Sequence, residues 1–114
     1  MISGYGKQIF VKEEEEYEGQ FFEGARHGAG LYSYKDGHFQ YEGEWKYGRR
    51  SGTGRLASAD GSYFYDGEWK RDLPHGFGKE RMLTGDYYEG NYVNGLREGH
   101  GKYQFVSNGS VYVG

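Results

Sequence analysis

Aromatic and charged residues alternate along the chain in short segments that return at a nearly fixed interval. In Tyr41-Glu-Gly-Glu-Trp45 the two rings and the glycine occupy alternate positions, and carboxylates lie between them. Alternation with a period of two predicts a β-strand with one apolar and one polar face. Related segments begin at Tyr17, Tyr65 and Tyr88, and Tyr112-Val-Gly114 begins another. Successive leading tyrosines are 24, 24, 23 and 24 residues apart, which predicts a stacked repeat array.

A second motif, Gly-x-Gly, begins eleven residues after each of the first four leading tyrosines. A turn signal then precedes the next tyrosine: Asp36-Gly37, Asp60-Gly61, Thr84-Gly85 or Asn108-Gly109. Because Asp-Gly and Asn-Gly favour type I′ turns, each unit is predicted to be a β-hairpin closed there. The segments after the fifth residue of each copy, such as 46–51, are expected to be longer and more variable loops. The acidic run 13–16 is expected to form a longer solvated loop.

The shorter third interval requires a local adjustment, because a one-residue slip would turn every later side chain to the opposite face. We expect a β-bulge or an altered loop near Gly85 or Val106. The predicted fold is all-β, a single-layer antiparallel sheet of stacked hairpins, elongated and twisted, over residues 1–114. Residues 1–16 and the segment from 112 read as partial repeats, as in an excerpt from a longer array or an array whose ends are closed by another element.

Strand periodicity places the rings on one face of the sheet, here called the ringed face, and most charges on the other, the charged face. A structural column on the ringed face is expected to comprise Tyr17, Gly19, Tyr41, Gly43, Tyr65, Gly67, Tyr88 and Gly90. The charged face combines Glu18, Glu42, Glu44, Asp66, Glu68 and Glu89 with Lys7, Arg55, Lys79 and Lys102. Opposite charges on neighbouring strands would form a solvated ladder, and about ten strands would give a strip roughly 50 Å long.

The composition fits a repeat array, because 13 tyrosines and 22 glycines replace most of the large aliphatic residues of a globular core. The chain has no cysteine, which excludes disulfides and thiolate metal sites and favours an intracellular, cytoplasmic location. The net charge of -3 argues against non-specific nucleic-acid binding. No apolar run approaches the roughly 20 residues of a membrane-spanning helix.

The combination of Tyr-Glu-Gly-Glu-Trp-Lys, a following glycine, His-Gly-x-Gly, an aromatic pair and Asp-Gly resembles the MORN (membrane occupation and recognition nexus) repeat. The copies from Tyr17 and Tyr41 match this pattern best. Departures are Phe21 and Tyr92 in place of tryptophan, Asp72 in place of glycine, and the segment 79–82, which lacks the aromatic pair and should weaken the third unit's ring stack. The resemblance implies a sheet of successive hairpins in scaffold and adaptor proteins of ciliary, cytoskeletal or membrane-contact assemblies. It assigns no activity to the repeats themselves.

Two functions are compatible with these residues. The first is a non-enzymatic protein-interaction scaffold that binds a protein segment, or a second array as a homodimer, along the ringed face. Its expected contact residues are Phe21, Tyr34, Trp45, Tyr47, Trp69 and Tyr92. The alternative is binding of an anionic phospholipid such as a phosphoinositide, with Lys46, Arg49, Arg50 and Arg55 as the candidate lipid contacts.

Other chemistries fit less well. An aromatic cage for a small cation is conceivable because choline-binding repeats are also short aromatic hairpins, but they lack the phrases described above. Enzymatic activity is not expected, because the carboxylates fall on a solvated face that would not shift their pKa. No metal or cofactor is expected, because His27 and His75 lie two repeats apart and no helix follows the Gly-x-Gly motifs.

Overall fold

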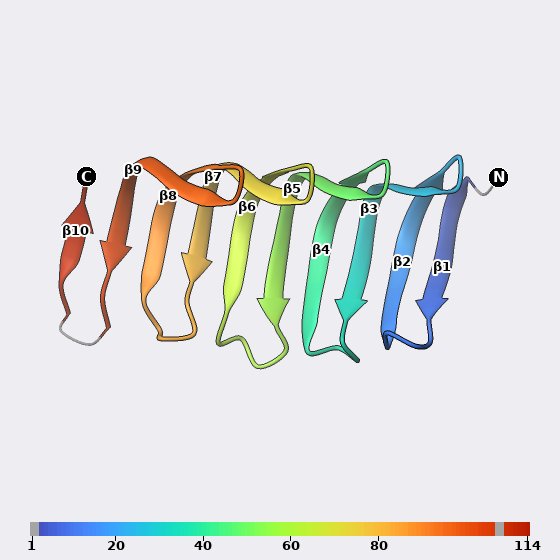
Figure 1. The fold of residues 1–114 in the computed structure, drawn as a ribbon, viewed down its shortest axis with the longest axis horizontal. Helices are drawn as coiled ribbons and strands as arrows, with labels where there is room; N and C mark the ends of the chain where they lie inside the picture. Colours follow the sequence, from blue (N-terminus) through green and yellow to red (C-terminus); the bar gives the residue numbers. More distant parts are fainter. Residues whose placement is uncertain (1–2, 107–108) are drawn as a thin grey trace.

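The computed structural model describes residues 3–106 and 109–114, and within these ranges the chain forms ten β-strands and no helix (Figure 1). The strands are β1 (Gly4–Phe10), β2 (Glu15–Phe22), β3 (Ala25–Tyr34), β4 (Phe39–Lys46), β5 (Arg49–Ser58), β6 (Phe64–Lys70), β7 (Leu73–Arg81), β8 (Tyr87–Val93), β9 (Leu96–Gln104) and β10 (Val111–Val113).

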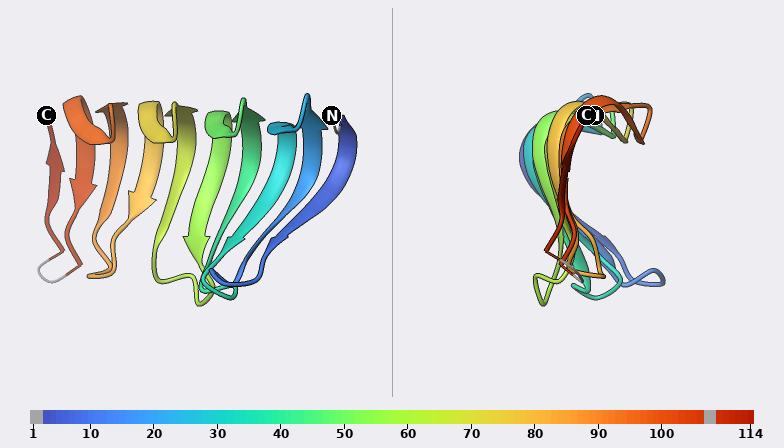
Figure 2. Two further views of the ribbon diagram at one scale, coloured as in Figure 1. Left: turned by 45° about the vertical axis from the view of Figure 1, so that its right-hand side comes forward. Right: turned by 90° about the vertical axis from the view of Figure 1, so that its left-hand side faces the viewer.

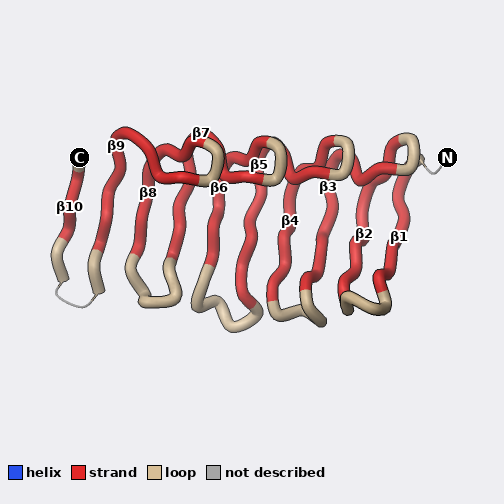
Figure 3. The backbone as a smooth tube through the Cα atoms, in the orientation of Figure 1, coloured by secondary structure: helices blue, strands red, loops and turns tan. Residues whose placement is uncertain are grey.

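All ten strands belong to one open antiparallel sheet in the order β1 to β10, so each strand pairs only with its neighbours in sequence. The molecule extends 52 × 26 × 17 Å, and the strands run across its longest dimension (Figure 1). The predicted single-layer sheet of hairpins is therefore confirmed, as is its length of roughly 50 Å. Successive connections alternate between the two long edges of the sheet (Figure 3).

The tight turns lie at the edge opposite to the one predicted. Two-residue turns join the strands at Glu23-Gly24, Tyr47-Gly48, Arg71-Asp72 and Asn94-Gly95, and every one of these residues has a positive φ. Tyr47 (φ 49°) and Gly48 (φ 81°), for example, connect the paired residues Lys46 and Arg49. This backbone is that of a type I′ hairpin. We call this edge the turn edge.

The Asp-Gly signals lie instead in the longer connections of the opposite edge, the loop edge, which span residues 35–38, 59–63 and 82–86. The prediction that tight turns form there, with longer loops after the fifth residue, was wrong. In the second of these loops the Asp60 carboxylate accepts hydrogen bonds from Ser62 N (3.0 Å) and Ser58 Oγ (2.8 Å), so it organises a longer loop. The acidic run is only half loop, because β2 begins at Glu15. Asn108 of the fourth signal lies outside the described residues.

Each strand pair that is joined at the turn edge has a register shift, which lies at the first glycine of Gly-x-Gly. Gly43 pairs with Gly54, yet Trp45 pairs with Arg50, so β5 contains two extra residues opposite Glu44. Gly52 occupies this irregularity with a left-handed φ of 67°, which favours glycine. Equivalent shifts follow Gly19, Gly67 and Gly90. The ends of the hairpins at the turn edge curl over to one side of the sheet (Figure 2).

The shortened third interval is absorbed by the loop around Gly85. Tyr88 follows its partner Glu80 by eight residues, whereas Tyr65 follows its partner Leu56 by nine. The strands on both sides remain in register, so the altered loop that we predicted is confirmed at Gly85. The β-bulges occur elsewhere, at the Gly-x-Gly motifs.

Nine aromatic residues form the buried core on the ringed face: Tyr17, Phe21, Tyr32, Tyr41, Trp45, Tyr65, Trp69, Tyr88 and Tyr92. Tyr17, Tyr41 and Tyr65 each link two repeats. The Tyr41 ring packs edge-to-face on Trp45 of its own repeat (centroids 5.1 Å, 84°) and on Trp69 of the next (5.2 Å, 86°). This is the geometry that aromatic quadrupoles favour. Neighbour-to-neighbour contacts thus replace a central core.

The second glycine of Gly-x-Gly makes room for this ring. A Cβ atom on Gly54 would collide with the Tyr41 hydroxyl oxygen and ring carbons, and Gly30, Gly78 and Gly101 stand in the same relation to the other leading tyrosines. The Tyr41 hydroxyl, held over the glycines, donates a hydrogen bond to the Glu44 carbonyl oxygen (2.8 Å). Tyr17, Tyr65 and Tyr88 donate equivalent bonds three residues onward. Ring and glycine therefore form one structural unit.

Candidate interaction surfaces

The rings at the fifth position of each repeat are part of the core. Phe21, Trp45, Trp69 and Tyr92 retain only 8%, 4%, 5% and 3% of their accessible surface. The expectation that these four rings are presented to a partner is therefore wrong, because the curled ends of the hairpins cover them. Of the other two expected contact residues, Tyr34 is half-buried and Tyr47 is exposed at the turn edge.

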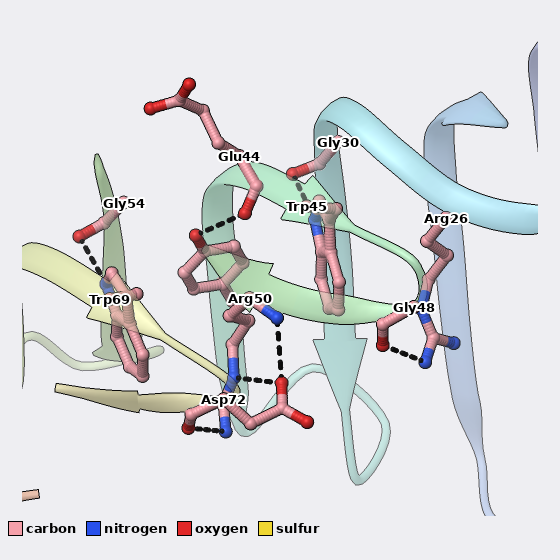
Figure 4. A network of polar contacts seen from close by, with 10 residues as sticks. Arg26, Gly30, Glu44, Trp45, Gly48, Arg50, Gly54, Trp69 and Asp72 are labelled. Atoms are coloured by element: carbon pink, nitrogen blue, oxygen red, sulfur yellow. Dashed lines mark hydrogen bonds and ion pairs between the residues drawn. The ribbon is translucent and has the colours of Figure 1, made fainter. Parts of the chain in front are cut away.

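Arginines near the turn edge form the cover over the tryptophans (Figure 4). The Arg26 guanidinium lies 4.9 Å from the centre of the Trp45 ring and donates to the Gly48 carbonyl oxygen (3.0 Å). Arg50 lies 4.6 Å from the Trp69 ring. These distances are those of cation–π contacts. Each arginine thus joins its own repeat to the next one.

Arg50 is also held by Asp72, the residue that replaces glycine in the third turn. Its Nε donates to Asp72 Oδ1 (3.2 Å), its Nη2 donates to the Asp72 carbonyl oxygen (2.9 Å), and its backbone nitrogen donates to Oδ1 (2.8 Å) (Figure 4). Because these nitrogens and the ring contact engage the side chain, Arg50 has a structural role. It is not free to contact a lipid, so this part of the expected lipid site is corrected.

A polar network replaces an aromatic ring in the third repeat. Glu80 lies on the ringed face where the first repeat has Tyr32, and it accepts hydrogen bonds from the Tyr92 hydroxyl (2.7 Å) and Arg97 Nη2 (2.8 Å). The Glu80 side chain is only 13% exposed. The place of the missing ring is therefore taken by the hydrogen-bonded ion pair of Glu80 and Arg97. Alternation already placed Glu80 on the ringed face, which was the signal for this contact.

Burial shifts the ionisation of the core tyrosines. Removal from water raises the pKa of Tyr41, Tyr65 and Tyr92, and in Tyr92 the hydrogen bond to the Glu80 carboxylate adds to the effect. Burial, and then the hydrogen bond to Glu15 (2.8 Å), raise the pKa of Tyr32 to about 12. These phenols therefore stay neutral well above the ordinary tyrosine range.

A half-exposed apolar ribbon remains on the ringed face beside the buried core. It consists of Phe10, Tyr34, Leu56, Met82 and Tyr103, which pack against the core at successive places along the array. Two hollows lie on the same face. One of about 240 Å³ is lined by Tyr34, Phe39 and Leu56 among others. The second, of about 180 Å³, lies around Tyr63, Pro74 and Glu80. Solvent reaches the side chains of this ribbon on the ringed face.

Basic side chains gather around a hollow of about 450 Å³ at the turn edge. Its lining is Lys46, Tyr47, Arg49, Ser51, Lys70 and Arg71. Lys46 and Arg49 of the expected lipid site lie here, whereas Arg55 lies on the charged face with its guanidinium 4.7 Å from the Phe64 ring. Sequence reasoning missed Lys70 and Arg71, because they belong to the next turn and only the stacking of repeats brings them close.

The charged face carries the predicted opposite charges on directly paired residues. At mid-strand one row of directly paired residues crosses all ten strands: Lys7, Glu18, Leu31, Glu42, Arg55, Asp66, Lys79, Glu89, Lys102 and Val113. The ion pairs closer than 4.0 Å among the described residues are Lys7–Glu16, Arg50–Asp72 and Arg97–Glu80. Among the described residues, the charged side chains from Glu42 to Lys102 in this row therefore form no ion pair of this length.

These features define a β-repeat array in which each hairpin is held by its neighbours. The MORN repeat model matches residues 17–39, 41–63, 65–87 and 88–110, so the chain belongs to the MORN repeat family. A comparison with curated proteins gives no significant match. MORN repeats are a non-catalytic repeat family that is generally associated with protein or membrane interaction.

Two absences apply to the part of the chain that the structure describes. None of its segments forms a helix with the length and apolar character needed to cross a bilayer. No three His, Cys, Asp or Glu residues in the ranges 3–106 and 109–114 lie close enough to hold a metal ion together.

Proposed function

We propose that the chain is a non-enzymatic interaction scaffold that binds a protein segment lengthwise along the apolar ribbon of the ringed face. The observation that carries this proposal is the ribbon itself, from Phe10 to Tyr103, which offers one half-exposed apolar side chain at a time along the array. Apolar surface left accessible to solvent, especially where polar residues surround it, marks interaction sites. Assignment to a cytoskeletal, ciliary or membrane-associated assembly rests on the family resemblance.

The spacing of the ribbon favours a helical segment. Neighbouring repeats are two strands apart, which is about 9.6 Å at the usual strand spacing. Seven residues of an α-helix rise about 10.5 Å. A helix with an apolar residue at every seventh position would therefore place one side chain near each repeat. The ion pair of Glu80 and Arg97 beside the second hollow would add a polar contact at one place.

Site-specific crosslinking tests this proposal. A photoreactive amino acid is introduced at Leu56, on the ringed face, or at Ala57, the adjacent residue whose side chain points to the charged face. A protein segment in the ribbon should be captured from position 56 and not from position 57. Capture of a protein other than a second copy of this chain equally from both positions, or from position 57 alone, would contradict the proposal.

A second candidate function is docking on an anionic membrane, which we propose for the turn edge. The observation in its favour is that exposed apolar residues flank the basic hollow along this edge: Phe22, Leu73, Val93 and Leu96. Basic residues near an anionic membrane contribute about 1 kcal/mol each, and the apolar side chains would enter the interface.

Vesicle sedimentation tests this second candidate. Binding to vesicles that contain phosphoinositide should fall at least tenfold in Lys46→Glu/Arg49→Glu, because two of the four cations around the hollow are reversed. The matched control is Lys79→Glu, which reverses a cation on the charged face. Equal retention of all three proteins would exclude the turn edge as the membrane-binding surface.

A further inference from the structure

The charged face has a sign pattern that repeats with the strands. In the mid-strand row the Gly-x-Gly strands β5, β7 and β9 contribute cations, and the tyrosine-led strands β4, β6 and β8 contribute carboxylates. The exposed pair Arg55 and Asp66 lies at the middle of the ten-strand sheet. A strict alternation of sign has a geometric consequence for two copies placed face to face.

We propose that the charged face is a self-complementary docking surface for a second copy of this chain, related by a two-fold axis parallel to the strands between β5 and β6. This axis reverses the order of the strands. Arg55 of one copy then faces Asp66 of the other, and the converse contact forms by symmetry. Glu42 faces Lys79, and Glu18 faces Lys102. No two like charges face each other in the row.

The competing face-to-face arrangements are repulsive. A two-fold axis along the length of the array would place every residue of the row opposite itself, so each charge would meet a like charge. An axis parallel to the strands but centred on one strand, such as β5, would place Glu42 opposite Asp66 of the second copy. Like charges across an interface disfavour wrong arrangements, so the alternation selects an axis between two strands.

The row nearer the loop edge agrees with the same axis. It runs Ile9, Glu16, Ser33, Gln40, Ala57, Phe64, Arg81, Tyr87, Gln104 and Val111. Reversal of the strand order places Ala57 opposite Phe64 at the centre and Ile9 opposite Val111 at each end. Ile9 and Val111 are 60% and 53% exposed in the single chain. Apolar residues therefore meet apolar residues under the operation that pairs the opposite charges.

The dimensions of the face suit such a contact. A face of 52 by 26 Å has room for the roughly 800 Å² per partner that a standard interface buries. Packed sheets lie about 10 Å apart, which two facing charged side chains can span. Arg55 and Asp66 lie nearest to the axis, so their contacts are at the centre of the interface. The ringed face stays free, so this inference does not depend on the proposed scaffold function.

Charge reversal at the centre tests the proposal by sedimentation. The wild-type chain should form dimers at about 0.05 M salt and dissociate as salt rises to about 1 M, because screening weakens the facing pairs. Arg55→Asp and Asp66→Arg should each be monomeric alone. An equimolar mixture of the two variants should form a heterodimer, since the new carboxylate at position 55 of one chain then faces the new guanidinium at position 66 of the other. The double variant Arg55→Asp/Asp66→Arg should dimerise by itself.

Controls separate the interface from a folding defect. Circular dichroism verifies that each variant is folded, and Arg49→Asp makes the same charge change at the turn edge and should dimerise like the wild type. A damaged monomer would not regain dimerisation on mixing. The proposal is overturned by a monomeric wild type at low salt, by single variants that dimerise as the wild type does, or by a mixture that stays monomeric.

Discussion

The tightest structural requirement in each repeat is the glycine under the leading tyrosine, and Gly54→Ala perturbs it directly. The added methyl group would overlap Tyr41, which is fully buried. Overpacking of this kind costs about 1–3 kcal/mol when the backbone yields. If the ring is displaced instead, two edge-to-face contacts of about 0.5–1.5 kcal/mol each and a hydrogen bond of about 1 kcal/mol are lost. The two routes together predict destabilisation of about 1–4 kcal/mol.

The matched control is Gly61→Ala in a loop of the same repeat. A Cβ there would meet open space, and the left-handed φ of 77° costs about 1–2 kcal/mol, partly offset by a stiffer unfolded chain. Urea unfolding followed by fluorescence of Trp45 and Trp69, which flank the Tyr41 ring, measures both variants. In a Tyr41→Ala background, Gly54→Ala should cost less than about 0.5 kcal/mol, because the clash is gone. Equal destabilisation by Gly54→Ala in both backgrounds would refute the steric account.

Three further predictions concern the arginine cover, the polar network and the buried phenols. Arg50→Met should lower the free energy of unfolding by about 1–2 kcal/mol, because it removes the Asp72 contacts and the cation–π contact with Trp69. In the same urea assay the control Tyr47→Ser, at an exposed site, should change this free energy by less than about 0.5 kcal/mol. Glu80→Gln should cost about 1–2 kcal/mol and shift the thermal midpoint downward, since the charge-assisted bond to Arg97 is lost; an unchanged midpoint would contradict this role. Burial raises the pKa of Tyr41, Tyr65 and Tyr92, so the stability that each contributes is complete below pH 10 and falls by about 1.4 kcal/mol per pH unit above it. Circular dichroism and tyrosinate absorbance should therefore change together above pH 10. Titration of these phenols near pH 10 in the folded protein would contradict their burial.

The architecture is readable from sequence because its causes are local and repeated. Alternation in Tyr41-Glu-Gly-Glu-Trp45 sets the two faces, and the constant interval sets the pairing of each strand with its neighbours. Four copies in phase remove the ambiguity that one short strand would leave. The charged row followed from the same alternation, and the register of the structure confirms it.

Other features depend on information that the alternation does not contain. Asp-Gly predicts type I′ turns at the loop edge, whereas these turns form after the fifth residues, where Asn94-Gly95 carries the same signal. Burial of Trp45 depends on the curl of the hairpin ends, near which Gly52 has a left-handed φ. The basic hollow required the stacking of separate turns, which brings Arg71 beside Arg49. These are tertiary effects, and each reverses or extends an inference made from one segment.

Pairing of every strand with its sequence neighbours alone has a mechanical consequence. The strands run across the longest dimension of 52 Å, so tension applied along that dimension pulls adjacent strands directly apart. Hydrogen bonds loaded in this direction open one after another, whereas bonds sheared along a strand must break together. Because each repeat contacts only its neighbours, the array should yield at low force and lengthen in steps of one hairpin, as an extensible spacer whose apolar ribbon is lost one repeat at a time.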